Sequence, residues 1–145
     1  MKGKFFLDTN IFVYSFDETA KKKQQQARKL IRSSLQSGNG HVSFQVIQEF
    51  FNVALQKFAV PMPLLSCKEY LDKIFMQLEI VYPDAGHIKN GLDIATTTGY
   101  SFYDSLIISA ALRAGCETLY TEDLQHGQKI RNLTIVNPFL PQASC

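Results

Sequence analysis

The hydrophobic pattern of the chain begins with a short apolar run, Phe5-Phe6-Leu7, which stops abruptly at the polar residues Asp8, Thr9 and Asn10. Such a run is typical of a buried β-strand. Further apolar segments that suit strands cover residues 41–43, 79–82, 118–121 and 133–136. Segments with helical periodicity lie between them. This alternation predicts an α/β fold with a parallel sheet and helices on both of its faces.

The segments predicted to be helical are bounded by residues that usually start or stop helices. They cover residues 11–16, 20–37, 44–58, 66–78, 85–98 and 101–114. Residues 20–37 show the clearest periodicity, with Lys, Gln and Arg residues on one face and an apolar stripe on the other. The members of that stripe are Ala27, Leu30, Ile31 and Leu35.

The length of 145 residues suits one domain, which we expect to span residues 1–140 and to leave a short tail at residues 141–145. No stretch approaches the ~18 apolar residues of a membrane helix. Asp8 and Asn10 interrupt the N-terminal segment too early for a signal peptide. The three cysteines are too far apart to indicate a disulfide framework. We therefore expect a cytoplasmic protein with no membrane span.

The net charge is only +2, so the whole molecule shows no general preference for nucleic acid. The positive charges are nevertheless concentrated early in the chain, where few acids lie nearby. This basic cluster consists of Lys21, Lys22, Lys23, Arg28, Lys29 and Arg32. Lysine and arginine side chains can contact phosphates without reading a sequence. A solvated helix face explains the cluster equally well.

Four of the 13 acidic residues occupy positions that are unusual for an acid. Asp8 and Asp123 follow predicted strands. Glu49 lies on or beside the apolar stripe of a helix, and Asp104 opens the most apolar helix. Structural explanations remain open, since Asp8 and Asp104 could be helix caps, Glu49 could reach to water and Asp123 could be a turn residue. Glu122 competes with Asp123 for the same place.

These four acids could meet at one edge of the sheet, because ligands in open α/β folds bind outside the carboxyl ends of the strands. Four carboxylates repel one another unless a cation lies among them. Oxygen ligands suit Mg²⁺ or Mn²⁺. Such a metal activates water and stabilises charge on a phosphate. The sequence shows no competing Walker loop, dinucleotide fingerprint or serine or cysteine with a plausible histidine base.

The same residues resemble the motifs of the PIN domain family, and within it the VapC-like toxins of toxin–antitoxin pairs. The resemblance spans about residues 5–139 and rests on several short motifs. They are Leu7-Asp8-Thr9-Asn10, Glu49, Tyr103-Asp104-Ser105-Leu106-Ile107, Thr121-x-Asp123 and Asn137-Pro138-Phe139. Each motif is weak alone, but together, in this order, they are fairly specific.

The resemblance implies a three-layer α/β/α sandwich around a five-stranded parallel sheet, and a metal-dependent endoribonuclease site. The expected catalytic residues are Asp8, Glu49, Asp104 and Asp123. Mg²⁺, or Mn²⁺, would be bound by Asp8, Asp104 and Asp123, while Glu49 would orient the metal's waters or act in proton transfer. The expected supporting residues are Thr9, Asn10 and Thr121.

The resemblance also implies an RNA substrate, single-stranded or structured, a cognate antitoxin and a homodimer. The candidate RNA contacts are Lys21, Lys22, Lys23 and Arg28. Two alternatives remain. One is a PIN-like module that binds nucleic acid or protein without nuclease activity. The other is a phosphatase of the haloacid-dehalogenase type, but that chemistry needs a second aspartate where Asn10 stands.

Overall fold

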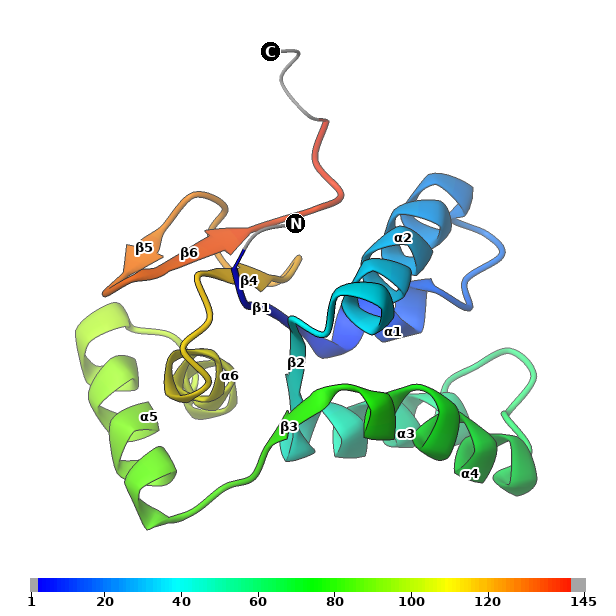
Figure 1. Ribbon diagram of the computed structural model, residues 1–145, viewed down its shortest axis with the longest axis horizontal. Coiled ribbons are helices and arrows are strands. Elements are labelled where there is room, and N and C mark those ends of the chain that lie inside the picture. The colour runs from blue at the N-terminus through cyan, green and yellow to red at the C-terminus, as the bar shows by residue number, and fades with distance from the viewer. Residues whose placement is uncertain (1–2, 142–145) are drawn as a thin grey trace.

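The alternation of strands and helices is present in the computed structural model, which describes residues 3–141 (Figure 1). The strands are β1 (Phe5–Leu7), β2 (Gly40–Ser43), β3 (Glu79–Val81), β4 (Thr118–Tyr120), β5 (Lys129–Ile130) and β6 (Leu133–Val136). The helices are α1 (Thr9–Tyr14), α2 (Lys21–Ser37), α3 (Phe44–Gln56), α4 (Leu64–Lys73), α5 (Ala85–Thr98) and α6 (Phe102–Arg113), with a short 3₁₀ helix, η1 (Phe75–Gln77). The predicted tail lies outside the described residues apart from Pro141.

The strands form one sheet in the order β3-β2-β1-β4-β6-β5. Five of them are parallel, which confirms the predicted parallel sheet. The sixth, β5, runs antiparallel to β6 and was not predicted. At two residues it is too short to show a pattern of alternating side chains. Its hairpin turns at Arg131, whose φ of 54° is in the left-handed region.

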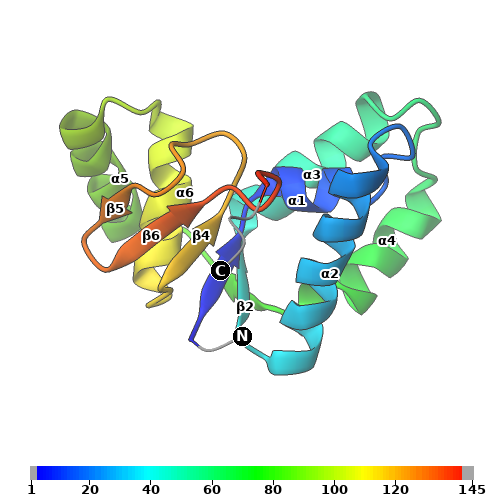
Figure 2. The same cartoon turned by 90° about the horizontal axis from the view of Figure 1, so that it is seen from above.

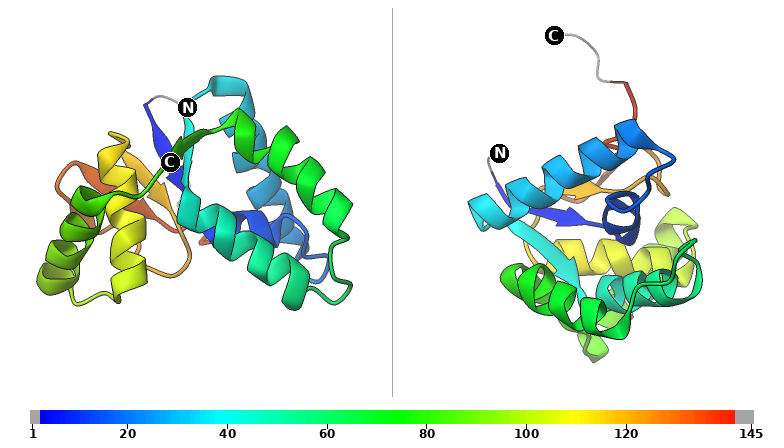
Figure 3. Two further views of the ribbon diagram at one scale, coloured as in Figure 1. Left: turned by 90° about the horizontal axis from the view of Figure 1, so that it is seen from below. Right: turned by 90° about the vertical axis from the view of Figure 1, so that its right-hand side faces the viewer.

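The helices form two layers on opposite faces of the sheet. Figure 2 shows α5 and α6 on one side and α1 to α4 on the other, and the left view in Figure 3 agrees. β1 lies in the centre of the sheet, and Phe5, Phe6 and Leu7 are all buried. A three-layer sandwich is therefore confirmed. No helix within residues 3–141 is long and apolar enough to cross a membrane.

Two predictions about the helices are wrong beyond small shifts of their ends. The helix predicted over residues 66–78 ends instead at Lys73, and η1 follows it. This change of direction allows Phe75 to pack against Phe12 and Phe50, with ring centroids 4.8 and 5.6 Å away. In α2, Leu35 was expected to face inward, but it is exposed. The buried residue at that end of the helix is Ser34, whose hydroxyl donates to the carbonyl of Leu30.

Candidate active site

The carboxyl ends of β1 and β4 lie side by side. Leu7 is paired with Tyr120, and the backbone N–H of Asp8 donates to the Tyr120 carbonyl over 3.0 Å. Asp8 and Thr121 are therefore the first residues beyond two neighbouring strands. Parallel pairing thus brings together two side chains that are 113 positions apart in the sequence.

Asp8 is buried, with only 6% of its surface exposed, and both of its carboxylate oxygens are hydrogen-bonded. Its Oδ1 accepts from the backbone N–H of Thr9 at 2.7 Å, so the residue caps α1. Its Oδ2 accepts from the fully buried hydroxyl of Thr121 at 2.8 Å. The predicted cap and the predicted place at the strand end are thus both observed in the same residue.

Burial raises the pKa of Asp8 from 3.8 to about 7, because removal from water disfavours the charged carboxylate. The hydrogen bonds from Thr121 and Thr9 oppose this change in pKa, and the negative charges of Asp123 and Glu49 add to it. Asp8 is therefore a carboxylate whose ionised form would be favoured by a nearby cation.

Asp123 is held beside Asp8 by two polar residues. The Asn10 amide donates to Asp123 Oδ2 over 3.0 Å, and the backbone N–H of Asp123 donates to the Thr121 hydroxyl over 3.1 Å. Burial raises the pKa of Asp123; the Asn10 bond opposes this, and the charges of Asp104, Glu122 and Glu49 reinforce it. The Thr121 hydroxyl therefore contacts both strand-end acids: it bonds to the carboxylate of Asp8 and to the backbone N–H of Asp123.

Glu49 reaches the same edge from α3. The Thr9 hydroxyl donates to Glu49 Oε1 at 2.8 Å, and the Gln45 amide donates to Oε2 at 3.2 Å. Gln45 also donates to the backbone carbonyl of Tyr103, which precedes Asp104. Gln45 was not predicted to belong to the site, although it lies one helical turn before Glu49 and hence on the same face.

Asp104 lies in the first turn of α6. The hydroxyl of Ser101 caps this helix by accepting from the backbone N–H of Asp104 at 3.1 Å. The cap of α6 is therefore Ser101, and Asp104, which could have been the cap, is the residue whose backbone N–H is capped. Asp104 acts on the rest of the site through its charge, which raises the pKa of Asp123.

Within residues 3–141 no three His, Cys, Asp or Glu side chains are arranged to hold a metal ion together. The acids nevertheless have the donor chemistry of a hard-cation site, since Asp8 is buried and the negative charges of Asp123 and Glu49 raise its pKa. Mg²⁺ keeps several waters and binds proteins through only one or two carboxylates. The residues present therefore fit a hydrated cation better than one enclosed entirely by protein.

Glu122 does not compete with Asp123 for this place. Its carboxylate accepts hydrogen bonds from Tyr14 and Lys23, whereas the carboxylate of Asp123 accepts from Asn10. The structure thus separates two neighbouring acids that the sequence left as alternatives.

Three of the four candidate RNA contacts have partners within the chain. Lys21 pairs with Glu18, Lys23 pairs with Glu122, and the Arg28 side chain donates to the carbonyl of Ser15 at 2.9 Å. Lys22 is exposed. A role for these residues in binding RNA stays a prediction.

One serine, Ser109, lies beside a histidine, His87. Ser109 Oγ is 3.0 Å from His87 Nδ1, and the two residues connect α6 to α5. The exposed fractions are 0% for Ser109 and 4% for His87, so no substrate reaches the pair. It serves packing between the helices.

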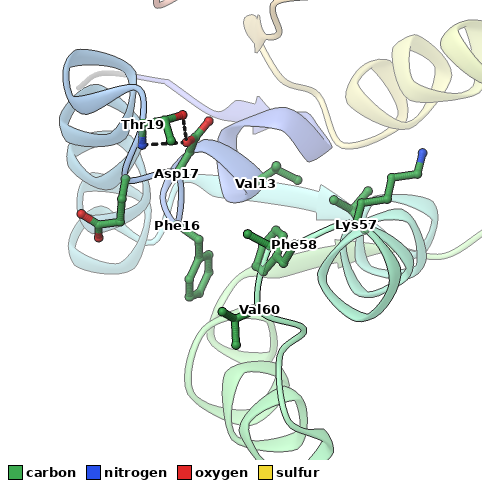
Figure 4. Close-up of a pocket in the computed structure, with 10 residues that line it drawn as sticks. Val13, Phe16, Asp17, Thr19, Lys57, Phe58 and Val60 are labelled. Atoms are coloured by element: carbon green, nitrogen blue, oxygen red, sulfur yellow. Dashed lines mark hydrogen bonds between the residues drawn. The ribbon is translucent and has the colours of Figure 1, made fainter.

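The cavity in Figure 4 is separate from these acids. It encloses about 630 Å³ and is lined by the end of α1, the loop after it and the end of α3, with Phe16 and Phe58 among its walls. None of the four predicted catalytic acids lines it. Asp17, at its rim, is already bonded to Thr19. The candidate site is therefore defined by its charges and hydrogen bonds.

The family model of the PIN domain matches residues 5–130. The chain belongs to the PIN domain family. A comparison with the sequences of curated proteins gives no significant match.

Three similar solved structures support the PIN fold. A toxin–antitoxin complex from Klebsiella pneumoniae has a chain with a TM-score of 0.67 at 14% identity, covering 93% of this chain and 98% of that one. VapBC2 from Rickettsia felis, bound to promoter DNA, has a TM-score of 0.60 at 22% identity, and the match covers 90% of this chain and 96% of that one. Mycobacterium tuberculosis VapC20, a sarcin–ricin loop cleaving toxin, has a TM-score of 0.58 at 13% identity, and the match covers 83% of this chain and 90% of that one.

Proposed function

We propose that this PIN-domain protein is a Mg²⁺-dependent endoribonuclease. The observation that carries the proposal is the burial of Asp8 beside Asp123, Thr121 and Asn10 at the ends of β1 and β4. Burying a carboxylate next to other acids costs stability unless a cation or a proton compensates it. Proteins retain such an arrangement chiefly where it performs chemistry.

Each residue of the site has a role in this proposal. Asp8, Asp104 and Asp123 would hold the cation. Bound Mg²⁺ lowers the pKa of a water and stabilises the charge that develops on the phosphodiester. Glu49, held by Thr9 and Gln45, orients the attacking water and accepts its proton.

We further propose that the protein is the toxin of a toxin–antitoxin pair. The support is the PIN family match together with the similar structures, whose titles name toxin–antitoxin and VapBC complexes. In this proposal a cognate antitoxin binds the chain and blocks cleavage, and the protein acts as a homodimer in the cytoplasm on an RNA substrate.

The test is cleavage of a defined RNA by the full chain in Mg²⁺, compared with the Asp8→Asn and Asp104→Asn variants. We expect each substitution to lower the rate at least 100-fold, because removing one essential group of a catalytic site has effects of that order. Asp93→Asn is the matched control, since it removes an exposed carboxylate from α5. Cleavage at the wild-type rate by both site variants would refute the proposal.

The second candidate is a binding module without nuclease activity. The observation that favours it is that Lys21, Lys23 and Arg28, three of the four candidate RNA contacts, already have partners within the chain. Metal binding that depends on Asp8, with no turnover of any RNA tested, would support this candidate instead. The phosphatase alternative gains no support, because Asn10 donates its amide to Asp123 and supplies no second acid.

A further inference from the structure

A cluster of four side chains behind the candidate site connects the loop carrying Asp123 to two helices and to the C-terminal segment. Its members are Tyr14 at the end of α1, Lys23 in the first turn of α2, Glu122 after β4, and Phe139. We name these residues the Glu122 cluster. None of them was predicted to belong to a common structure.

Both carboxylate oxygens of Glu122 are occupied in this cluster. The Tyr14 hydroxyl donates to Oε1 over 2.6 Å, and Lys23 Nζ donates to Oε2 over 2.5 Å. Lys23 Nζ also donates to the Tyr14 hydroxyl over 3.2 Å. Three groups that hydrogen-bond to one another in this way restrict the carboxylate more than a single ion pair would.

Aromatic rings lie against the Lys23 side of the ion pair. Lys23 Nζ lies 4.6 Å from the ring centre of Tyr14 and 5.6 Å from that of Phe139. The two rings meet edge to face with their centroids 4.9 Å apart. The side chains of Lys23 and Glu122 are only 38% and 27% exposed, so the pair is less screened than an ordinary surface pair.

The loop after β4 is thus held from two sides. Thr121 and Asp123 contact Asp8 and Asn10 at the site, while Glu122, between them, is held from behind by Tyr14 and Lys23. Holding Glu122 fixes the backbone on which Asp123 stands. Among the hydrogen bonds of the described residues, only the one from Asn10 reaches the Asp123 carboxylate.

We propose that the Glu122 cluster is a positioning device that keeps Asp123 directed at Asp8 for metal binding. This inference rests on the proposed metal-dependent function. It makes Lys23 a positioning residue and not an RNA contact, and it couples the C-terminal segment, through Phe139, to the metal site.

The test is Mn²⁺ binding to the full-length protein, measured by calorimetry. We expect Lys23→Met to weaken Mn²⁺ binding about three- to tenfold, since partners that orient a metal ligand directly affect affinity by about 10- to 100-fold and Lys23 acts one residue further away. Removing a positive charge near a cation site should by itself strengthen cation binding. A weaker affinity therefore distinguishes positioning from simple electrostatics.

Three further variants sharpen this test. Lys22→Met removes the same charge from the adjacent, exposed position and should leave Mn²⁺ affinity unchanged or slightly higher. Lys23→Arg keeps the ion pair and should retain affinity within about twofold. Tyr14→Phe removes only the hydroxyl and keeps the ring, so it remains informative if Lys23→Met fails to fold.

RNA cleavage supplies an independent measurement. For Lys23→Met we expect KM for RNA to stay within about twofold of wild type and kcat to recover at saturating metal. Unchanged Mn²⁺ affinity in both Lys23→Met and Tyr14→Phe, or equal weakening in Lys22→Met, would overturn the inference. If wild-type protein binds Mn²⁺ but cleaves no RNA, the nuclease proposal fails and the positioning role is still decided by the binding data.

Discussion

Replacement of Asp8 by asparagine should stabilise the metal-free protein at alkaline pH while removing its activity. The pKa of Asp8 is raised from 3.8 to about 7 in the folded state, so the folded protein keeps a proton that the unfolded chain releases. Stability from this group is therefore fully present below about pH 4 and is lost as the pH rises to about 7. Asparagine cannot ionise, so the stability of the variant does not fall in this way as the pH rises.

The size of the effect follows from the difference in pKa. A change of one pKa unit corresponds to about 1.4 kcal/mol, so ionising Asp8 in the folded state costs about 4 kcal/mol. Asparagine has one acceptor oxygen in place of two, so the variant loses one of the hydrogen bonds from Thr121 and Thr9, which offsets about 1 kcal/mol of this gain. The free energy of unfolding of Asp8→Asn should therefore be about 3 kcal/mol higher than that of wild type at pH 8.

The assay is urea unfolding in EDTA at pH 5 and pH 8, with Asp93→Asn as the control for loss of an exposed carboxylate. The stability difference between Asp8→Asn and wild type should increase by about 3 kcal/mol from pH 5 to pH 8. Addition of Mg²⁺ at pH 8 should stabilise wild type and leave the variant unchanged. A difference that is the same at both pH values would refute the account of Asp8.

Three further variants test other parts of the structure. Thr121→Val keeps the shape of a fully buried side chain but removes the donor to Asp8 and the acceptor for Asp123. It should lower the free energy of unfolding by about 2 kcal/mol at pH 7.5, measured by urea titration. Gly40→Ala would place a Cβ 2.3 Å from that of Ser34, and it should lower thermal stability by an amount equivalent to about 2 kcal/mol in calorimetry. Ser109→Ala should cost about 1–2 kcal/mol but leave RNA cleavage unchanged, whereas a loss of cleavage would indicate that the Ser109–His87 pair takes part in chemistry.

Local patterns in the sequence were sufficient to predict most of the framework. Strand β1 and the cap at Asp8 follow from an apolar run that meets a polar triplet. The start of α5 follows from Asp84, whose side chain accepts from the backbone N–H of His87. These features depend on neighbouring residues, which the sequence displays directly.

Features that depend on contacts between distant segments could not be predicted. Strand β5 exists only through its pairing with β6. The different hydrogen-bond partners of Glu122 and Asp123 are Tyr14, Lys23 and Asn10, which are about 100 residues away in the sequence. The proximity of Ser109 to His87 likewise requires α5 and α6 to pack together.

The most direct test of the central claim is the position of a bound metal ion. Crystals of wild-type protein soaked in Mn²⁺ should show anomalous scattering from an ion between Asp8 and Asp123, at the carboxyl ends of β1 and β4. Crystals of Asp8→Asn treated in the same way should lack this peak. An ion bound elsewhere, or an equal peak in the variant, would contradict the assignment of this edge as a metal-dependent nuclease site.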